Sequence, residues 1–203
     1  MNAPMMPVHD SGHVVDRAHI RDGSPHVLNA VRELVATIPD PELPMVSIAD
    51  LGILRDVRVD EDGLAIVEIT PTYSGCPAVD AIRDDIVRAL DAEGVIGRVD
   101  VVLSPAWTTD WITDTGRQAL ADAGIAPPAP RTGTRVSLGL GIRCPLCGSM
   151  HTRELSHFGS TACKALWVCE RCHEPFDRFK ELGPHPERLR TPRQRRVEEG
   201  WGV

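Results

Sequence analysis

Four cysteines arranged as two Cys-x-x-Cys pairs are the residues of this chain best suited to chemistry. The first pair is Cys144 and Cys147, the second is Cys169 and Cys172, and 21 residues lie between the pairs. A two-residue gap lets one tight turn aim two sulfurs at one ion, and Gly148 suits the left-handed backbone that such a turn needs. Four thiolates gathered in this way form a closed tetrahedral metal site.

Zinc is the metal that this pattern favours. Iron in a rubredoxin-like site is the alternative, because Cys-Pro-x-Cys-Gly occurs in both kinds of site. A thioredoxin-like redox pair would need a βαβ context, which neither pair has. Structural disulfides would suit a secreted mini-domain, and residues 1–10 do not resemble a signal peptide. The sequence therefore predicts a structural metal site.

A fifth cysteine, Cys76, stands two residues before an expected helix that begins near Ala78. The first amides of a helix lack internal partners and the positive end of its dipole lies there, so we expect a lowered pKa for this thiol. Such a thiolate would be reactive or metal-binding, and the alternative is a residue that only caps the helix. We expect the surrounding loop to be supported by the carboxylate of Asp50 and the hydroxyls of Thr70 and Thr72.

The sixth cysteine, Cys163, lies between the two pairs. Because four ligands already complete a zinc shell, we expect Cys163 to be a small packed residue. The sequence contains no phosphate-binding GxxxxGK[ST] loop and no GxGxxG motif that opens a helix, and no Ser-His-Asp triad stands out. These observations favour an accessory or binding protein over an enzyme.

Composition limits the remaining possibilities. The chain has 203 residues, a formal net charge of −7 and 42% apolar residues. No apolar run reaches the ~18 residues of a membrane span, and the acidic balance disfavours nucleic-acid binding. Six cysteines without a secretory signal predict a reducing compartment, so we expect the protein in the cytoplasm.

The periodicity of apolar residues predicts two structural units. Residues 24–125 follow the order α-β-β-α-β-α, which indicates an α+β domain with a small three-stranded sheet and helices packed on it. The expected helices cover 25–38, 78–92 and 109–124, and the expected strands cover 53–59, 64–70 and 99–103. Thr109 is the expected cap of the last helix.

The second unit is a small β zinc ribbon over residues 143–183. It is too small to fold by apolar burial alone, so the metal must supply folding energy. Its core candidates include Leu155, Phe158, Phe176 and Phe179. Three further segments complete the expected organisation: a disordered arm over 1–23, an exposed Pro- and Gly-containing linker over 126–142, and a flexible tail over 184–203.

Several motifs resemble known families. Asp40-Pro41-Glu42, Ser47-Ile48-x-Asp50-Leu51-Gly52 and Thr70-x-Thr72-x-x-Gly75-Cys76-Pro77 resemble the pattern of the SufT-like iron–sulfur assembly domain. Three segments, at 104–112, 158–166 and 174–180, extend the resemblance to the PaaD family of the bacterial phenylacetate catabolic pathway. This second resemblance spans about 24–183 and joins two unrelated units in one order.

The resemblance implies a factor that assembles or matures metal centres of the multicomponent phenylacetyl-CoA epoxidase. Its partners would be epoxidase components or iron–sulfur assembly proteins. Cys76 would hold or transfer a transient iron–sulfur cluster, while the ribbon would hold structural zinc. One cysteine supplies too few ligands for a cluster, so a homodimer or a partner would have to complete the site. The alternative is a non-catalytic structural subunit of the epoxidase complex.

Overall fold

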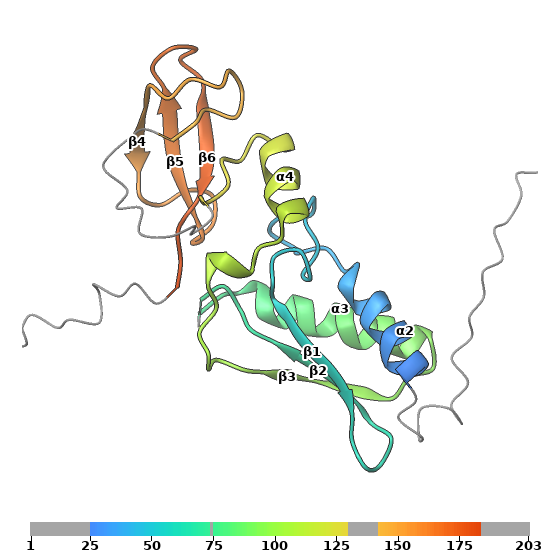
Figure 1. Cartoon of the computed structure of the whole chain (residues 1–203). Helices are drawn as coiled ribbons and strands as arrows, with labels where there is room; N and C mark the ends of the chain where they lie inside the picture. Colours follow the sequence, from blue (N-terminus) through green and yellow to red (C-terminus); the bar gives the residue numbers. More distant parts are fainter. Residues whose placement is uncertain (1–24, 74, 130–141, 184–203) are drawn as a thin grey trace, which may run out of the picture.

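The computed structural model describes residues 25–73, 75–129 and 142–183, which form two three-stranded sheets (Figure 1). Helices alternate with the strands of the first sheet in the order α-β-β-α-β-α, and the second sheet follows. The α+β class with a small β ribbon is therefore confirmed. The arm and the tail expected from the sequence lie outside the described residues. Within the described ranges, no helix is long and apolar enough to cross a membrane.

Two amphipathic helices cover one face of the first sheet (Figure 1). Helix α2 spans Pro25–Ala36, and α3 spans Ala78–Ala92. Their buried residues recur every three or four positions, as the periodicity predicts. These residues are Val27, Val31 and Val35 in α2 and Ala78, Ile82, Ile86 and Leu90 in α3.

The strands of the first sheet are β1 (Leu54–Val59), β2 (Ala65–Ile69) and β3 (Gly97–Val101). Strands β1 and β2 form an antiparallel hairpin, whereas β3 lies parallel to β2 because α3 connects them as a crossover. One row of paired positions across the three strands consists of Val57, Val67 and Val99. All three valines are buried under the helices. The third strand begins two residues earlier than expected.

The segment after β3 contains two short helices instead of one long one. A 3₁₀ turn, η1, spans Thr109–Trp111, and α4 spans Asp114–Asp122. The expectation that Thr109 caps the last helix is wrong. The hydroxyl of Thr113 caps α4 instead, because it accepts the amide of Gly116 at 3.0 Å.

The ribbon consists of β4 (Thr152–Ser156), β5 (Lys164–Cys169) and β6 (Pro175–Phe179), all antiparallel. Phe176 and Phe179 are buried as expected, but Leu155 and Phe158 are exposed. The ring of Phe158 is 74% exposed and lies beneath the ammonium of Lys180, 4.9 Å from its centre. A surface cation–π contact therefore takes the place of burial.

The ribbon packs directly against the α+β domain. Phe179 is fully buried, and its ring centre lies 6.0 Å from that of Trp107. The backbone amide of Thr109 donates to the carbonyl of Leu182 at 3.0 Å. Cys163 and Phe179 belong to the same apolar cluster as the buried residues of α2, α3 and the first sheet. One core therefore spans both sheets.

The start of the expected linker is held in place. Ala126 donates its amide to Asp177 at 2.8 Å and accepts the amide of Phe179 at 2.9 Å. It is only 1% exposed, so the expectation of an exposed chain at this point is wrong. The physical reason is that the open side of β6 offers backbone partners to an extended segment. Residues 130–141 of the linker lie outside the described residues.

Candidate metal centre and junction cavity

The four paired cysteines meet at the outer end of the ribbon, and we call this group the cysteine cage. The sulfurs of Cys144 and Cys172 are 3.9 Å apart, and those of Cys147 and Cys169 are 3.6 Å apart. All four sulfurs lie within 4.8 Å of one another. Tetrahedral zinc with bonds of about 2.3 Å would place its sulfurs about 3.8 Å apart. The donor set and its spacing therefore fit a closed metal site.

Two matching turns present the sulfurs of the cysteine cage. In the first, the amide of Gly148 donates to the carbonyl of Cys144 at 2.9 Å, and in the second His173 donates to Cys169 at 2.9 Å. Gly148 has a φ of 73° and His173 a φ of 62°. The left-handed glycine was predicted from the sequence. The histidine was not, because a side chain rarely takes this conformation.

Two thiols of the cysteine cage have pKa values shifted in opposite directions. The backbone amides of Cys172 and Arg171 donate to the sulfur of Cys169 and hold its pKa at about 6. The amide of Glu174 acts in the same direction on Cys172, but burial and the three neighbouring sulfurs raise the pKa of Cys172 to about 12. A divalent cation among the sulfurs would remove this conflict, since thiolates that coordinate a metal lose their protons.

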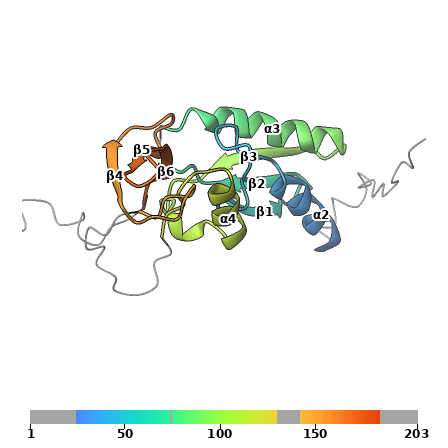
Figure 2. The same cartoon turned by 90° about the horizontal axis from the view of Figure 1, so that it is seen from above.

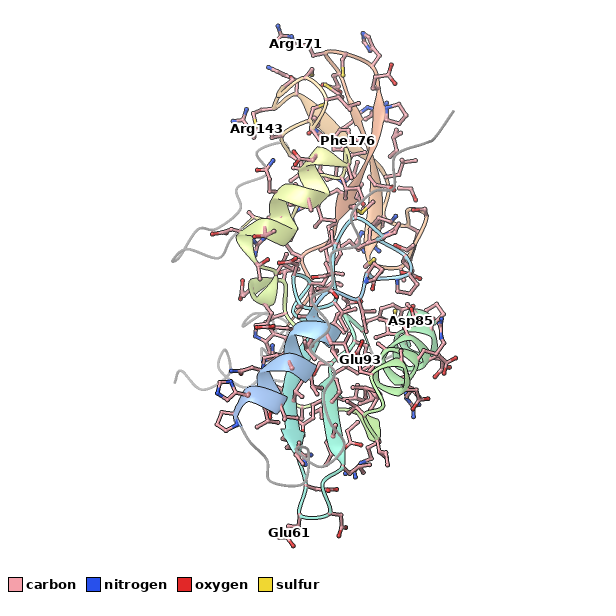
Figure 3. The ribbon with its side chains drawn as sticks, turned by 90° about the vertical axis from the view of Figure 1, so that its right-hand side faces the viewer. Glu61, Asp85, Glu93, Arg143, Arg171 and Phe176 are labelled. Atoms are coloured by element: carbon pink, nitrogen blue, oxygen red, sulfur yellow. The ribbon has the colours of Figure 1, made fainter. Side chains whose placement is uncertain are left out.

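The cysteine cage lies far from the first sheet. Figure 3 shows Arg143 and Arg171, which flank cage cysteines in sequence, at one end of the molecule, and Glu61 of the β1–β2 hairpin at the other. The guanidinium of Arg143 donates to the carbonyl of Gly148 at 3.0 Å and so braces the first turn. The position of the cage suits a structural metal centre that holds the ribbon together.

A second group of sulfurs lies where the ribbon meets the α+β domain. Cys76 and Cys163 line one small cavity there, together with Asp40 and Glu42. We call it the junction cavity. In Figure 2 the N-terminal end of α3, which follows Cys76, lies beside β5 and β6. The cavity has a volume of about 10 Å³, which is enough for one water molecule or ion.

Cys76 is half-buried at the mouth of α3. Burial raises the pKa of this thiol, the amide of Ala78 opposes the rise, and the carboxylates of Glu42 and Asp40 add to it. The expected lowering of the pKa is therefore wrong. Pro77 occupies the N-cap position and has no amide hydrogen to offer, so desolvation outweighs the helix terminus.

Cys163 comes from the ribbon, just before β5, and is 4% exposed. Burial raises the pKa of its thiol, and the hydroxyl of Thr161, 3.0 Å from the sulfur, opposes the rise. The expectation of a packed residue is confirmed, but its place beside Cys76 was not predicted. No local signal in the sequence indicates that the two cysteines share a cavity, because this depends on how the ribbon docks.

The acidic groups nearest Cys76 come from the Asp40-Pro41-Glu42 turn. Asp40 is 6% exposed, and its carboxylate accepts the amides of Glu42 and Leu43, each at 2.9 Å. Burial raises the pKa of Asp40 despite these bonds and despite the ammonium of Lys164. The sequence motif pointed to this turn, but not to its position against Cys76.

Asp50 has different partners. Its carboxylate accepts hydrogen bonds from Ser47 at 3.0 Å and Thr113 at 2.6 Å, and its carbonyl accepts the Thr113 amide at 2.9 Å. Asp50 thus fixes the start of α4. Of the two expected threonines, Thr72 lines the junction cavity, while Thr70 is buried and donates its amide to the carbonyl of Ile53, just before β1, at 2.8 Å.

Comparison with known proteins finds a matching family model for each of the two units. Residues 28–104 match the family model described as iron–sulfur cluster assembly protein, and residues 128–180 match the PaaD zinc beta ribbon domain. A protein of Escherichia coli K12, provisionally named as one of the subunits of 1,2-phenylacetyl-CoA epoxidase, is 44% identical over 158 residues. That alignment covers 77% of this chain and 94% of the relative. This chain belongs to the PaaD family.

Further relatives match the α+β domain alone. An Fe-S protein maturation auxiliary factor of Porphyromonas gingivalis is 35% identical and covers 45% of this chain and 86% of that protein. The auxiliary factor SufT of Staphylococcus aureus is 36% identical and covers 40% of this chain and 93% of that protein. The PaaD family thus joins an iron–sulfur assembly domain to a four-cysteine metal-binding ribbon.

Proposed function

We propose that this chain is a maturation factor that assembles or delivers iron–sulfur or metal centres for the phenylacetyl-CoA epoxidase. The observation that carries this proposal is the union of an iron–sulfur assembly domain with a PaaD ribbon in one chain. The E. coli relative takes its name from the epoxidase, and the relatives of the α+β domain take theirs from iron–sulfur maturation. Maturation of that enzyme's metal centres accounts for both relationships.

Cys76 is the proposed transfer thiol of this factor. It lies at the rim of the junction cavity, within reach of solvent, and Thr72 lies in the same wall. Because its pKa is raised, the sulfur stays protonated at neutral pH until a cation displaces the proton. A protonated sulfur also oxidises less readily than a thiolate. Thr70 and Asp50 would support the loop and α4 from behind.

The metal of the cysteine cage is proposed to be structural zinc. Four thiolates close the shell, so no position is left open for a substrate. The cage therefore differs from a transfer site, which must release its cargo.

The proposed partners are epoxidase components and iron–sulfur assembly proteins. A homodimer in which two Cys76 residues meet is one way to complete a cluster site. The proposed location is the cytoplasm, where the six free thiols stay reduced.

The test is complementation in a bacterium that lacks its own copy of this protein and grows on phenylacetate. Wild-type protein should restore epoxidase activity, whereas Cys76→Ser should remain folded and zinc-loaded but fail to restore it. A matched control, Thr70→Ser, keeps the loop hydroxyl and should restore activity. Full activity from Cys76→Ser would contradict the transfer role.

A second function is a non-catalytic structural subunit of the epoxidase, as the name of the E. coli relative suggests. The two functions predict different stoichiometry. A structural component stays bound to the purified active enzyme in a fixed ratio, whereas a maturation factor is absent from it. Active epoxidase that contains this protein at one copy per complex would favour the structural role.

A further inference from the structure

We propose that Cys163 of the ribbon is the second sulfur ligand of the Cys76 site, so that the junction cavity binds one thiophilic divalent cation such as Fe²⁺. This inference rests on the proposed function, because it completes the ligand set of the same transfer thiol. It replaces the need for a second copy of the chain. Under this inference, the ribbon supplies a metal ligand to the site in addition to its structural role.

The donors of the junction cavity suit such an ion. Two cysteines and two acidic residues line it. They come from the 40–42 turn, from the residue before Pro77 at the start of α3, and from the residue before β5. Mixed sulfur and oxygen ligands are compatible with Fe²⁺ and Zn²⁺. The raised pKa of Tyr73 has burial as its main cause, followed by Cys76, Glu42 and Cys163. The same three groups therefore act on one neighbourhood.

The carboxylate of Asp40 is buried, and the two backbone amides that it accepts compensate its charge only in part. A buried negative charge is costly unless a positive group compensates it. The nearest buried cation, Lys164, also has its ammonium 3.5 Å from the carboxylate of Asp177. A divalent ion in the junction cavity would compensate Asp40 and Glu42 together. An alanine or serine at position 163 would satisfy a purely packed role equally well.

The ribbon fixes the position of Cys163. The carbonyl of Cys163 accepts the amide of Lys180 at 2.8 Å, at the end where β5 and β6 meet the α+β domain. The opposite end of β5 is Cys169, a member of the cysteine cage. One strand therefore connects the structural metal centre to the proposed site. This connection gives a physical reason for joining the two units in one chain.

Binding requires the donors of the junction cavity to move closer together. Among the described residues, only the cysteine cage brings three or more ligand atoms within 4.8 Å of one another. The donors of the junction cavity are more widely spaced, so an ion would draw the half-buried Cys76 side chain toward Cys163. As each sulfur–metal bond forms, the S–H bond breaks and the proton leaves to solvent.

The test uses the full-length protein with zinc in the ribbon, titrated with Co²⁺ under reducing, oxygen-free conditions. Cobalt bound to thiolates absorbs strongly in the near ultraviolet, so the intensity counts sulfur ligands. We expect one Co²⁺ beyond the zinc, with an absorption that falls by half in either Cys76→Ser or Cys163→Ser. Each substitution should weaken binding by at least ~10-fold, the scale seen for loss of even an outer-shell partner.

Two further variants keep the test decisive. Cys163→Ala serves if the serine disturbs the core, and circular dichroism with zinc content verifies its fold. Ser160→Ala removes a hydroxyl of the same loop that bonds Asp177 instead of Cys163, so it should bind Co²⁺ like the wild type. No extra thiolate-bound cobalt in the wild type, or unchanged binding in both Cys163 variants, would overturn the proposal.

Complementation separates this inference from the proposed function. If Cys76→Ser fails and both folded Cys163 variants restore full epoxidase activity, the ligand role of Cys163 is wrong and the maturation role stands. If Cys76→Ser also restores activity, the transfer role of Cys76 fails, and the shared site fails with it. Loss of activity in the folded Cys163 variants supports the shared site.

Discussion

The cysteine cage and the junction cavity use the same side chain in opposite ways. In the cage, sulfurs only 3.6 and 3.9 Å apart are fixed by two matching turns, and backbone amides hold the pKa of Cys169 at about 6. In the cavity, burial raises the pKa of both thiols, and carboxylates take the place of additional sulfurs. The first arrangement favours permanent occupation by a metal, and the second favours reversible binding.

The difference shows why the number of thiols in a protein says little about their role. Four sulfurs close a shell and leave nothing for exchange. In the proposed site, two sulfurs with oxygen donors would bind an ion that can be passed on. The following predictions test this contrast, beginning with the change expected to have the largest effect.

Loss of one cage sulfur should unfold the ribbon. Cys144→Ser opens the shell, and structural zinc contributes on the order of 10–16 kcal/mol of apparent binding energy in zinc-finger peptides. We expect loss of the bound zinc and loss of protection from hydrogen exchange over β4 to β6. The first sheet should stay folded but become less protected, because Phe179 leaves the shared core. A strong chelator should have the same effect on the wild type. An ordered ribbon in metal-free protein would contradict the structural role of the cage.

Loss of the junction should destabilise both units together. Phe179→Ala removes a fully buried ring that contacts Trp107 and lines the cavity, at a cost of about 3–5 kcal/mol. Urea unfolding followed by fluorescence should show this loss while zinc stays bound. Phe158→Ala is the matched control, because that ring is exposed and should change stability little. If the two units of Phe179→Ala unfolded in separate transitions and the stability of the α+β domain did not change, the junction would not be part of the core.

Removal of the buried charge at position 40 should stabilise the protein and weaken the proposed site. The folded-state pKa of Asp40 is raised, so its stabilising effect is complete below the ordinary value of 3.8 and is lost as the pH rises through the folded pKa. At neutral pH the charge is a net cost. Asp40→Asn keeps an oxygen for the two amides and removes that cost.

Thermal unfolding of Asp40→Asn should therefore occur at a higher temperature than that of the wild type at pH 7, with the gap closing toward pH 4. Binding of Co²⁺ in the junction cavity should weaken in the same variant. Glu61→Gln, at the exposed tip of the first hairpin, is the control for loss of a charge. A variant with lower stability at pH 7 would show that the carboxylate is compensated within the protein.

The smallest effect concerns the second turn of the cage. His173 has a left-handed backbone that costs a non-glycine residue about 1–2 kcal/mol. His173→Gly should recover about 1 kcal/mol of this and slow the release of zinc to a chelator. Gly148→Ala, in the matching turn, should have the opposite effect. Faster release from His173→Gly would mean that the histidine side chain itself supports the cage.

The sequence was most informative where the signal is local. The spacing of the four paired cysteines predicted the cage, and the 3.6-residue period predicted α3 over residues 78–92 with correct ends. The hairpin turn at residues 60–63 follows from its turn-forming side chains. Local spacing and period suffice here because neighbouring residues form these structures.

The docking of the ribbon could not be predicted in the same way. The contact of Phe179 with Trp107, the pairing of Ala126 with β6 and the cavity shared by Cys76 and Cys163 all join distant segments. The pKa of Cys76 was predicted in the wrong direction for the same reason. The local helix terminus was visible in the sequence, whereas the burial imposed by the ribbon was not.

The most direct test of the maturation role is the metal content of the client itself. Epoxidase components are purified from cells that contain wild-type protein, Cys76→Ser or no copy of this chain, and iron and acid-labile sulfide are measured per polypeptide. The account predicts full occupancy with the wild type and a matching deficit in the other two, at equal client abundance. Equal iron and sulfide in all three preparations would contradict the proposed function.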